Sequence, residues 1–526
     1  MIRLILEAVK EWVESLLYDT LGLVPTFDTM PTDAELVSHL NSIAPLTSYN
    51  FRTKGYYAKN DGEGGMYRVS NEAVQGARKF VVENNTYYLV PTDIKTTERI
   101  DVCRLGIRPY TAERNGNVTV KDSFAETNSE YISNIYINGT PHDAVLVFPA
   151  GRFYFKNTIN LTAFEIGVEG VAPARARNEI ANSGLFGGGT VLCFPFLNDG
   201  DSAILQGDGN FRNVLIIGSK ANYDFTIDRT LLKTNPSGVV TETVKQTGEN
   251  TNFTNIGLRK TGSGYIENVN VMHFYRGILA NAQNVYVDNV FAKKCHVGCT
   301  CGNDVKINRL FGWNIHTLLQ ITGAITSVIQ LRVDSCVHAV QISPISSSAS
   351  IKGLTFVDID GDWCTDSLIK IGNDENYVEV ANSIFSSIHG RCNILKYYNV
   401  SDTPPSASDL NRDNSEGYGI IRVSKYASFK NNMVSFNTIG NSNVEDSPTP
   451  TILTPPIMLT FSSGGNGVLG NTFKVASSQI ASTSDVAKVL QFGSENGTSA
   501  KIETSYDTYY VKGSTVDSIR DAQHPN

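Results

Sequence analysis

The stretch IENVNVMHFYRGILANAQNVYVDNVFAKKCHVGCTCGNDVKINRLFG, from Ile266 to Gly312, repeats one short pattern three times. The copies are IENVNV from Ile266, VDNVFA from Val287 and INRLFG from Ile307, so the steps between them are 21 and 20 residues. Each copy begins with a β-branched residue. A regular period in the twenties is typical of a solenoid, in which stacked coils bury together a core that one coil cannot bury alone.

The same pattern extends in both directions along the chain. It occurs as FRNVLI, IQLRVD, IKGLTF, VANSIF, FKNNMV and VLGNTF, starting at Phe211, Ile329, Ile351, Val380, Phe429 and Val468. No LxxLxL motif and no helical stretch recurs within the period, which argues against a leucine-rich repeat. We therefore predict an all-β chain built as a parallel β-helix. Wider steps mark long insertions, which in a solenoid overhang one face and wall a groove.

The composition limits the classes of protein to which this chain can belong. It has 526 residues, with 44 Lys plus Arg against 52 Asp plus Glu and a formal net charge of −8. Such a chain lacks the basic surface that nucleic-acid binding needs. No stretch reaches the roughly 18 consecutive apolar residues of a membrane span, so we expect no membrane insertion. The 8 cysteines are widely spaced, which favours reduced thiols and folding in a cytosol.

The chain divides into four expected regions. Residues 1–45 form an N-terminal helical adaptor, 46–105 a small β module, 106–474 the β-helix, and 475–526 a C-terminal β cap or trimerisation region. Near the N-terminus, Ile2, Ile5, Val9, Trp12 and Leu16 make a heptad seam, while charged residues between them argue against an export signal. Either an oligomerising or docking helix or an ordinary amphipathic helix fits this seam.

Two local motifs lie between that seam and the solenoid. Thr32 with Glu35 three residues later is a capping box, which predicts a helix that ends near Pro45. In FRTKGYYAKNDGEGGMYRVSN, two β-prone runs flank a glycine-rich turn from Asp61 to Gly65, which predicts a hairpin.

Two runs of sequence resemble one family of β-helix proteins. DAVLVFPAGRFYF, from Asp143 to Phe155, resembles the entry coil of the pectate-lyase-like superfamily. GYYAKNDGEGGMYRV, from Gly55 to Val69, resembles the small β-module before such helices in bacteriophage tailspikes and capsular polysaccharide depolymerases. The resemblance implies a right-handed β-helix and a homotrimer on a virion tail. It also implies folding in the host cytoplasm, an N-terminus attached to the tail baseplate or another fibre, and a bacterial surface polysaccharide as partner, with no cofactor.

This resemblance has a clear limit. Where the family usually carries Gly-Asp-Gly-x-x-Asp-Asp before its first helix, this chain reads PYTAERNGNVTVKDSFAETNSEYI from Pro109. The expected fold survives this departure. The family's active-site residues cannot be carried over, so candidates have to come from the residues of this chain.

The densest acidic cluster is VDIDGDWCTD, in which Asp358, Asp360 and Asp362 are spaced by two residues. On a straight strand such side chains share a face and lie roughly 7 Å apart, which suits the two carboxyl groups of an inverting glycosidase. We expect these three residues to be catalytic. Trp363 and Asp366 are expected to bind substrate, the tryptophan by packing on a sugar ring. A polar turn and a calcium site remain open alternatives.

Residues further along the chain are expected to contact substrate or indicate a different reaction. Glu379 follows the acidic coil and could supply a carboxylate from a neighbouring rung. His389 and Arg391 are spaced by two residues, and a polysaccharide lyase needs a base together with a cation that neutralises the substrate carboxylate. His316 and His338 fall at similar places in adjacent coils, where stacked structural histidines are the simpler interpretation.

A second acidic pair comes from the ladder itself. Glu267 and Asp288 both follow the leading residue of a copy, so their backbones should stack about 4.8 Å apart, a spacing that suits a retaining glycosidase. Asn308 and Gln330 continue the same row. This continuation favours an outward polar stripe instead.

The cysteine-rich run CHVGCTC, from Cys295 to Cys301, could suggest zinc. Its C-x3-C-x-C spacing is not that of a standard finger, and Cys299, Cys364 and Cys392 lie 12 or 13 positions after their ladder residues. We therefore predict buried free thiols and no metal site.

Together these patterns favour a polysaccharide depolymerase, with endo-glycosidic hydrolysis preferred over β-elimination. A non-enzymatic glycan-binding spike and a purely structural virion protein remain alternatives.

Overall fold

The computed structural model describes a large part of the chain. The described residues are 26–27, 31–40, 49–53, 66–72, 78–82, 85–92, 99–107, 109, 122–133, 144–162, 165–173, 189–220, 223–225, 254–344, 349–364, 367–372, 376–392, 421–424, 427–440, 459–462, 468–469, 472–475, 490–493, 504–505 and 508–511. The predicted heptad seam, the glycine-rich turn, Asp366 and Pro45 lie outside these residues.

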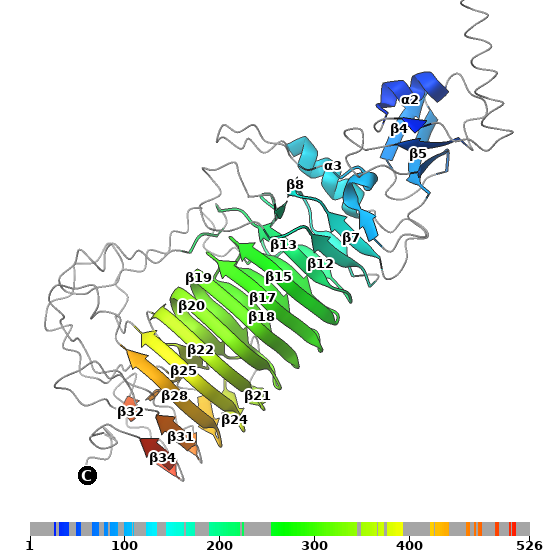
Figure 1. The fold of residues 1–526 in the computed structure, drawn as a ribbon. Helices are drawn as coiled ribbons and strands as arrows, with labels where there is room; N and C mark the ends of the chain where they lie inside the picture. Colours follow the sequence, from blue (N-terminus) through cyan, green and yellow to red (C-terminus); the bar gives the residue numbers. More distant parts are fainter. Residues whose placement is uncertain are drawn as a thin grey trace, which may run out of the picture.

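Most described residues belong to one 24-stranded sheet that is curled into a parallel β-helix (Figure 1). Its strands are β6 Arg99–Asp101, β7 Val145–Phe148, β8 Gly151–Tyr154, β9 Ile159–Leu161, β10 Gly167–Gly170, β11 Thr190–Cys193, β12 Ser202–Gln206, β13 Phe211–Ile217, β14 Ile256–Lys260, β15 Gly264–Met272, β16 Arg276–Ala280, β17 Val285–Lys293, β18 Val297–Cys301, β19 Val305–Ile321, β20 Ser327–Ile342, β22 Thr355–Cys364, β23 Ile369–Ile371, β25 Ile384–Cys392, β26 Ile421–Val423, β28 Met433–Gly440, β29 Leu459–Ser462, β31 Thr472–Val475, β32 Leu490–Gly493 and β34 Thr508–Val511. The predicted all-β solenoid is confirmed.

The repeat seen in the sequence is the register of this sheet. Phe211 pairs with Ile266, Ile266 with Val287, and Val287 with Ile307, all in parallel. The leading residues of successive copies therefore stack on one another, as the period predicts.

The ladder proposed beyond Ile307 was wrong by one residue. Ile307 pairs with Val328, not Ile329, and Val328 pairs with Phe356. Val328 is buried whereas Ile329 is 52% exposed, so two adjacent aliphatic residues gave the sequence pattern two possible registers. Only the inward one stacks.

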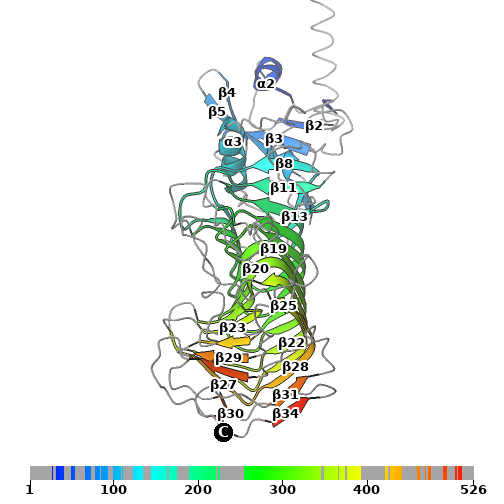
Figure 2. The same cartoon turned by 90° about the vertical axis from the view of Figure 1, so that its left-hand side faces the viewer.

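Later members of the proposed ladder belong to a different sheet. Ile351, Val380, Phe429 and Val468 pair in that order within a separate five-stranded parallel sheet. Its strands are β21 Ala349–Lys352, β24 Val378–Ala381, β27 Ala427–Lys430, β30 Val468–Leu469 and β33 Thr504–Ser505. Figure 2 shows β27 and β30 on the opposite side of the lower solenoid from β22, β25 and β28.

The recurring asparagine marks a bend within each long strand. Asn213, Asn268 and Asn289 have φ of 60°, 54° and 52°, in the left-handed region that asparagine tolerates better than most residues. Their amides form a ladder, since Asn268 Nδ2 donates to Asn213 Oδ1 at 2.8 Å and Asn289 Nδ2 donates to Asn268 Oδ1 at 3.0 Å. Each bend turns the strand while the next residue still points into the core.

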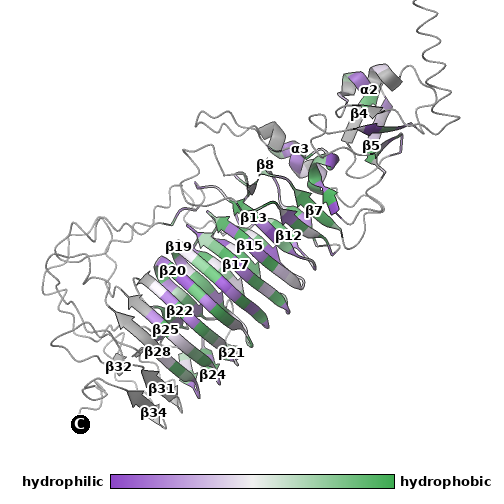
Figure 3. Cartoon of the chain, viewed as in Figure 1, coloured by the Kyte–Doolittle hydropathy of each residue, from purple (hydrophilic) through white to green (hydrophobic). Residues whose placement is uncertain are grey.

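Inward rows of aliphatic side chains hold the rungs together. Figure 3 shows apolar and polar residues alternating along the strands. One inward row consists of Val269, Val290, Leu310, Leu331, Ile359 and Ile388, all fully buried. Because each side chain packs on the one above and below, burial of this row favours stacking over any isolated coil.

The N-terminal region forms a small separate sheet of β1 Thr26–Phe27, β2 Asn50–Thr53, β3 Met66–Ser70, β4 Arg78–Val82 and β5 Asn85–Pro91, with helix α2 Asp33–Leu40. The capping box is confirmed, because the Glu35 N–H donates to Thr32 Oγ1 at 3.2 Å and the Thr32 N–H donates to Glu35 Oε2 at 2.8 Å. β2 and β3 are antiparallel, as the hairpin prediction requires.

Two short helical segments and the C-terminal strands complete the described chain. The 3₁₀ helix η3 spans Val102–Leu105, and α3, Asp122–Ser133, packs against β8 and β9 (Figures 1 and 2). β32 and β34 continue the parallel stacks of β29 and β31, so the rungs extend to Val511.

Several long connections leave the solenoid at the same corner. Ile217, Arg391 and Gly440 lie in one register row near the ends of β13, β25 and β28. After these strands the described chain resumes its rungs only at β14, β26 and β29. The groove walls predicted for these insertions lie outside the described residues.

Candidate active site

Two rows of strand positions run in register along the long sheet beside this corner, and we call them the outward rows. The first row contains Phe291, Phe311, Arg332, Asp360 and His389 in register. The second row contains Lys293, Trp313, Asp334, Asp362 and Arg391. The structure thus brings four predicted site residues, Asp360, Asp362, His389 and Arg391, to neighbouring positions on β22 and β25.

The residues between the two rows explain why these positions face outward. Ala292, Gly312, Val333 and Gly361 are buried between them. At Gly361 an added Cβ would collide with the Leu368 side chain, so glycine lets the next strand pack closely behind the acids. Strand alternation then places the flanking positions on the outer face.

The outward rows change character along the helix axis. At the N-terminal end Leu215, Ile217 and Met272 are buried in a cluster that includes Ala125 of α3. Further along, the side chains of Arg332 and Asp360 are 54% and 46% exposed, with Arg332 Nε 3.9 Å from Asp360 Oδ2. Lys293, earlier in the second row, is only 2% exposed, so the rows become accessible near Arg332 and Asp360.

Asp358 lies on the same strand but in a different environment. Its φ is 60°, so it occupies the bend row that contains asparagine on earlier rungs, and Gln330 Nε2 donates to its Oδ2 at 3.0 Å. The strand is not straight at this residue, so the roughly 7 Å spacing expected for Asp358 and Asp360 does not apply. The geometry resembles a polar corner more than a catalytic position.

Glu379 does not join the acidic cluster. It lies on β24 in the separate five-stranded sheet, where its carboxylate is 3.0 Å from Lys430 Nζ and 3.8 Å from Lys352 Nζ. The hydrogen bond from Lys430 lowers the pKa of Glu379 most, and Ser350 Oγ also donates to it. Its expected place beside the acids of β22 is therefore wrong. Trp363 follows Asp362 on β22 and is level with Ser335 of β20, a corner residue with φ of 61°.

Among the outward-row residues that sequence reasoning missed, Trp313, Arg332 and Asp334 matter most for the site. Asp334 lies six positions after Val328, as Asp362 lies six after Phe356, so the shared offset would have revealed the row with the right register. Lys293 Nζ sits 4.0 Å from the centre of the Trp313 ring, a cation–π contact that fixes this ring beside the acids.

A buried segment borders the second outward row across the corner. We call Tyr223, Asp224 and Phe225 the strap; all three are buried. Asp224 Oδ1 is 3.1 Å from Lys294 Nζ and 3.7 Å from His273 Nδ1. Because Lys294 and His273 are corner residues with φ of 54° and 60°, the strap is anchored where the strands turn.

The strap covers a column of aromatic and histidine rings. Tyr275 stacks on His296 at 4.5 Å, and His296 stacks on His316 at 4.2 Å. Tyr223 Oη lies 3.0 Å from His296 Nδ1, and Phe225 contacts the His316 ring at 5.8 Å. Burial lowers the pKa of His296 to about 4. Burial also lowers the pKa of His316 well below its usual range.

This column contains His316 and His338, two of the histidines that the sequence offers as candidates for a lyase base. His338 is buried, contacts the His316 ring edge-on at 5.8 Å, and pairs with Thr317 in the strand register. His316 and His338 are therefore one residue out of register with each other. Both pack as structural rings, which favours the simpler interpretation.

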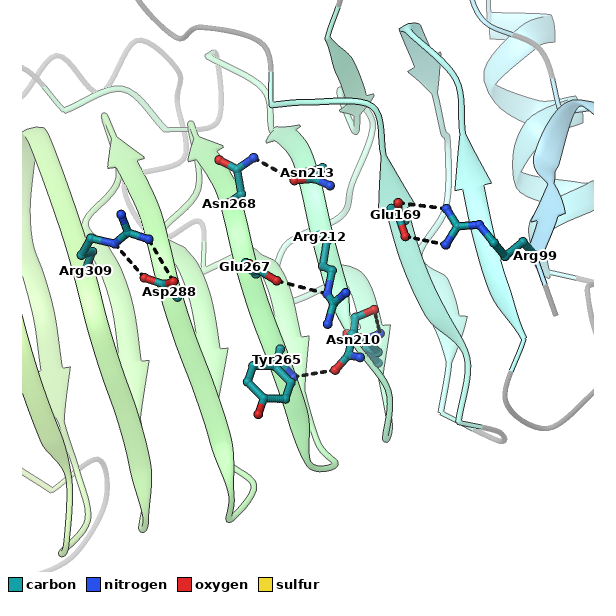
Figure 4. Close-up of polar contacts among 11 residues, drawn as sticks. Arg99, Glu169, Asn210, Arg212, Asn213, Tyr265, Glu267, Asn268, Asp288 and Arg309 are labelled. Atoms are coloured by element: carbon teal, nitrogen blue, oxygen red, sulfur yellow. Dashed lines mark hydrogen bonds and ion pairs between the residues drawn. The ribbon is translucent and has the colours of Figure 1, made fainter. Parts of the chain in front are cut away.

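The second acidic candidate, Glu267 with Asp288, is ion-paired (Figure 4). Glu267 Oε2 lies 3.3 Å from Arg212 Nε, and Arg309 binds Asp288 through two hydrogen bonds of 2.9 and 3.0 Å. The hydrogen bonds from Arg309 lower the pKa of Asp288. A carboxylate held ionised by a guanidinium is a poor general acid, so the outward polar stripe is favoured. Its expected continuation is partly wrong, because Gln330 pairs with Arg309 rather than Asn308.

The cysteines whose side chains the structure describes are buried thiols, as predicted: Cys103, Cys193, Cys295, Cys299, Cys301, Cys336 and Cys364. Burial raises the pKa of Cys295 to about 12. The proposed cysteine row is corrected, since Cys364 pairs with Cys336 and Cys392, whereas Cys299 pairs with Leu319.

The described residues also bear on metal binding and on membranes. Within them, no group of three or more His, Cys, Asp or Glu side chains is placed to hold a metal ion. No helix among them is long and apolar enough to cross a membrane.

Comparison with known proteins finds similarity only at the level of structure. No family model and no curated protein sequence matches the chain. A tailspike from Acinetobacter baumannii bacteriophage Fri1, described as a capsular polysaccharide depolymerase, has 12% identity to this chain and a TM-score of 0.44. The match covers 95% of this chain and 76% of the tailspike chain.

Two other solved structures give similar values. The enzymatically active domain of bacteriophage CBA120 tailspike protein 2 has 9% identity and a TM-score of 0.39, covering 96% of this chain and 59% of its own. DFA-IIIase from Arthrobacter chlorophenolicus A6 has 13% identity and a TM-score of 0.42, covering 80% of this chain and 100% of its own. Because all three TM-scores are below 0.5, function has to be argued from the residues of this chain.

Proposed function

We propose that this protein is a polysaccharide depolymerase of the tailspike type, which hydrolyses glycosidic bonds in a bacterial capsule or O-antigen. The observation that carries the proposal is the pair of outward rows, where Asp334, Asp360 and Asp362 lie beside Trp313 and Arg332 on a rigid sheet. Glycosidic hydrolysis needs two carboxyl groups at a fixed separation, and aromatic rings pack on the apolar faces of sugars.

We assign roles to two of the acids, and the strand register supports this assignment. Asp334 pairs with Asp362, so Asp360, two residues earlier on β22, is the diagonal neighbour of Asp334. Diagonal positions on adjacent strands are roughly 7–8 Å apart, within the range of about 6.5 to 9.5 Å that leaves room for a water in an inverting glycosidase. Asp334 and Asp360 are therefore the proposed acid–base pair, with Asp362 as a third carboxylate and Asp358 as a corner residue.

Neighbouring cations suit the substrate side of the site. Arg332 Nε lies 3.9 Å from Asp360 Oδ2, and the Arg332 side chain is 54% exposed, so its guanidinium could also contact substrate. Trp313 would pack against a sugar ring beside Asp334. The insertions that leave at the adjacent corner would then wall the groove, as their positions in the sequence suggest.

Cleavage of isolated polysaccharides tests the proposed reaction. The protein is incubated with a panel of purified capsules and O-antigens, and new reducing ends are measured together with ultraviolet absorbance. Hydrolysis gives reducing ends without absorbance from unsaturated uronic products. Proton NMR of the first product should show the inverted anomer. Binding without new ends would instead indicate a non-enzymatic spike, and neither binding nor cleavage would indicate a structural protein.

A lyase is the second candidate, because His389 pairs with Asp360 and Arg391 pairs with Asp362 across β22 and β25. A base and a guanidinium on one strand, spaced by two residues, are what β-elimination from a uronic acid requires. Strong ultraviolet absorbance that develops with the reducing ends would select this reaction.

The assembly and location are part of the proposal. The N-terminal heptad seam and the resemblance to tailspikes support a homotrimer that attaches to a virion tail through residues 1–45. A monomeric mass near 57.4 kDa in light scattering at micromolar concentration would contradict the trimer.

A further inference from the structure

The outer face of the long sheet carries a second aromatic feature, far along the strands from Asp334 and Asp360. Tyr265 and Tyr286 occupy paired positions on β15 and β17; their ring centres are 4.8 Å apart and their planes differ by 20°. Lys306 on β19 places its ammonium 5.0 Å from the centre of the Tyr286 ring. These three side chains form a stack whose last member, Tyr265, is 45% exposed.

The next rung toward the N-terminus leaves one face of the Tyr265 ring without an aromatic neighbour. Asn210 lies opposite Tyr265, because Phe211 pairs with Ile266, and Asn210 Oδ1 accepts a hydrogen bond from the Tyr265 backbone N–H at 3.0 Å. Among the described residues, Tyr286 is the one ring in contact with Tyr265. A short side chain thus occupies the place where a third ring would continue the stack.

An ion pair lies two residues further along the same two strands. Arg212 Nε is 3.3 Å from Glu267 Oε2, and these side chains are 38% and 45% exposed. Figure 4 shows Tyr265, Asn210 and the Arg212–Glu267 pair on the same side of neighbouring strands. The site therefore offers a fixed apolar ring together with a guanidinium donor and a carboxylate acceptor.

We propose that Tyr265, Asn210, Arg212 and Glu267 form a non-catalytic binding site for an uncharged, hydroxyl-rich segment of the polysaccharide. This inference rests on the proposed function. A sugar presents an apolar face that packs on an aromatic ring and hydroxyl groups that exchange hydrogen bonds with fixed polar side chains. Because the guanidinium and carboxylate neutralise each other, the site gives no preference to a charged partner.

The rigidity of the stack favours binding of a weak ligand. Tyr286 and Lys306 support Tyr265 from behind, so little side-chain freedom is lost when a sugar packs on the ring. Tyr265 lies on β15 seven residues before Met272, and Met272 is in register with Lys293 of the second outward row. A long polymer can therefore reach both sites, whereas a short oligosaccharide occupies only the cleavage site.

Steady-state kinetics of Tyr265→Ala on two substrates test the inference. The first substrate is a purified capsular polysaccharide that the wild-type protein cleaves, and the second is a mixture of short oligosaccharides taken from an early stage of that digestion, which the wild-type protein still cleaves. We expect the KM for the polymer to rise roughly three- to tenfold, the loss of one aromatic contact, with kcat unchanged. Cleavage of the short substrate should not change. Tyr265→Phe keeps the ring and should retain the wild-type KM.

Matched measurements separate the possible outcomes. Val357→Ala removes another exposed apolar side chain, 38% exposed on β22, and should leave the polymer KM unchanged. If Tyr265→Ala keeps the wild-type KM while the polymer is cleaved, the binding site is refuted and the proposed function stands. If Tyr265→Ala changes the mass in light scattering, the ring belongs to a contact between copies and the inference is wrong. If the wild-type protein neither binds nor cleaves any polysaccharide, both proposals fall together.

Discussion

The two ends of the long strands carry acids in two different register rows and in different electrostatic settings. At the beginning of the strands, each acid is paired with an arginine on a neighbouring strand. Arg212 pairs with Glu267, and Arg309 donates two hydrogen bonds of 2.9 and 3.0 Å to Asp288. At the end of the strands, Asp360 has Arg332 at 3.9 Å and an exposed side chain. We call the region of Glu267 and Asp288, where arginines pair with the acids, the closed end. The region of Asp334 and Asp360, where the Asp360 side chain is exposed, is the open end.

This difference shows how a repetitive fold can localise chemistry. Stacking alone places like residues in rows, and a row of charged residues is stable when opposite charges alternate along it. A site instead requires acids that are not fully neutralised, next to groups that bind substrate. The outward rows meet that condition only after the cover of α3 ends and the sheet becomes accessible.

The largest expected effect comes from removing the ionisable groups at the open end. Asp334→Asn and Asp360→Asn preserve side-chain size but remove the acid or base, so kcat on the cleaved polysaccharide should fall roughly a hundredfold or more. The melting temperature should change little, because Asp360 is 46% exposed. Reducing-end assays and thermal melts on the same preparations measure both quantities.

The closed end supplies the control for this experiment. Glu267→Gln changes an equivalent acid that is already paired with Arg212 and should leave kcat unchanged. If Glu267→Gln abolishes cleavage while Asp360→Asn does not, the assignment of the two ends is reversed. If Asp358→Asn alone is inactive, with normal melting, the catalytic residue lies at the bend.

The fold could be predicted from the sequence to a much greater extent than the site. The period around Ile266 and Val287 follows from steric stacking, which repeats in the sequence and is therefore visible. The register at Val328 could not be decided, because Ile329 is an equally suitable strand residue and only packing distinguishes them. That single-residue error concealed Asp334, since its relation to Asp362 depends on the register.

The site residues that were predicted correctly as neighbours share a simple property. Asp360 and Asp362 lie on one strand, and His389 and Arg391 on the next, so local two-residue spacing and one rung of stacking bring them together. Glu379 failed because a chain turn takes it into another sheet, where Lys430 and Lys352 bind it. Sequence distance does not reveal such a change of sheet.

A second prediction concerns the buried ion pair beside the open end. Asp224→Ala removes the carboxylate that lies 3.1 Å from Lys294 Nζ, and the two side chains are only 4% and 6% exposed. Removing one partner of a buried pair typically costs about 3–5 kcal/mol, since the other charge stays buried. Chemical denaturation should show a loss of this order. A change below about 1 kcal/mol would mean that water reaches Lys294 and that the strap is not a firm boundary of the site.

The same boundary should make the protein sensitive to acid. Burial lowers the pKa values of His273, His296 and His316 in the folded state, with His296 at about 4. Lowered histidine pKa values mean that the unfolded chain takes up protons first, so this stability is present above about pH 6.5 and is lost as pH falls toward 4. Asp224 raises the pKa of His273, whereas Lys294 and Lys220 lower it further. Arg276 and His338 lower the pKa of His296, and His296, His338 and Lys370 lower that of His316.

Melting temperatures between pH 7.5 and pH 4 measure this sensitivity. His296→Gln keeps a polar side chain that does not titrate in this range, so its melting temperature should depend less on pH than that of the wild-type protein. Equal pH dependence in the two proteins would exclude His296 as a source of the acid sensitivity.

The smallest expected effect is at the closed end, where the ion pairs lie near the surface. Asp288→Asn weakens the two hydrogen bonds from Arg309, whose side chain is 44% exposed against 28% for Asp288. Exposed pairs are screened by solvent and are usually worth about 1 kcal/mol or less, so denaturation should show a change of that size that shrinks further in high salt. Activity should be unchanged. If Asp288→Asn instead lowers stability as much as Asp224→Ala does, the alternating charges of the closed end are essential to the stacking of the rungs. The two ends would then both carry charges that stabilise the fold, and the proposed contrast between a structural end and a catalytic end would be wrong.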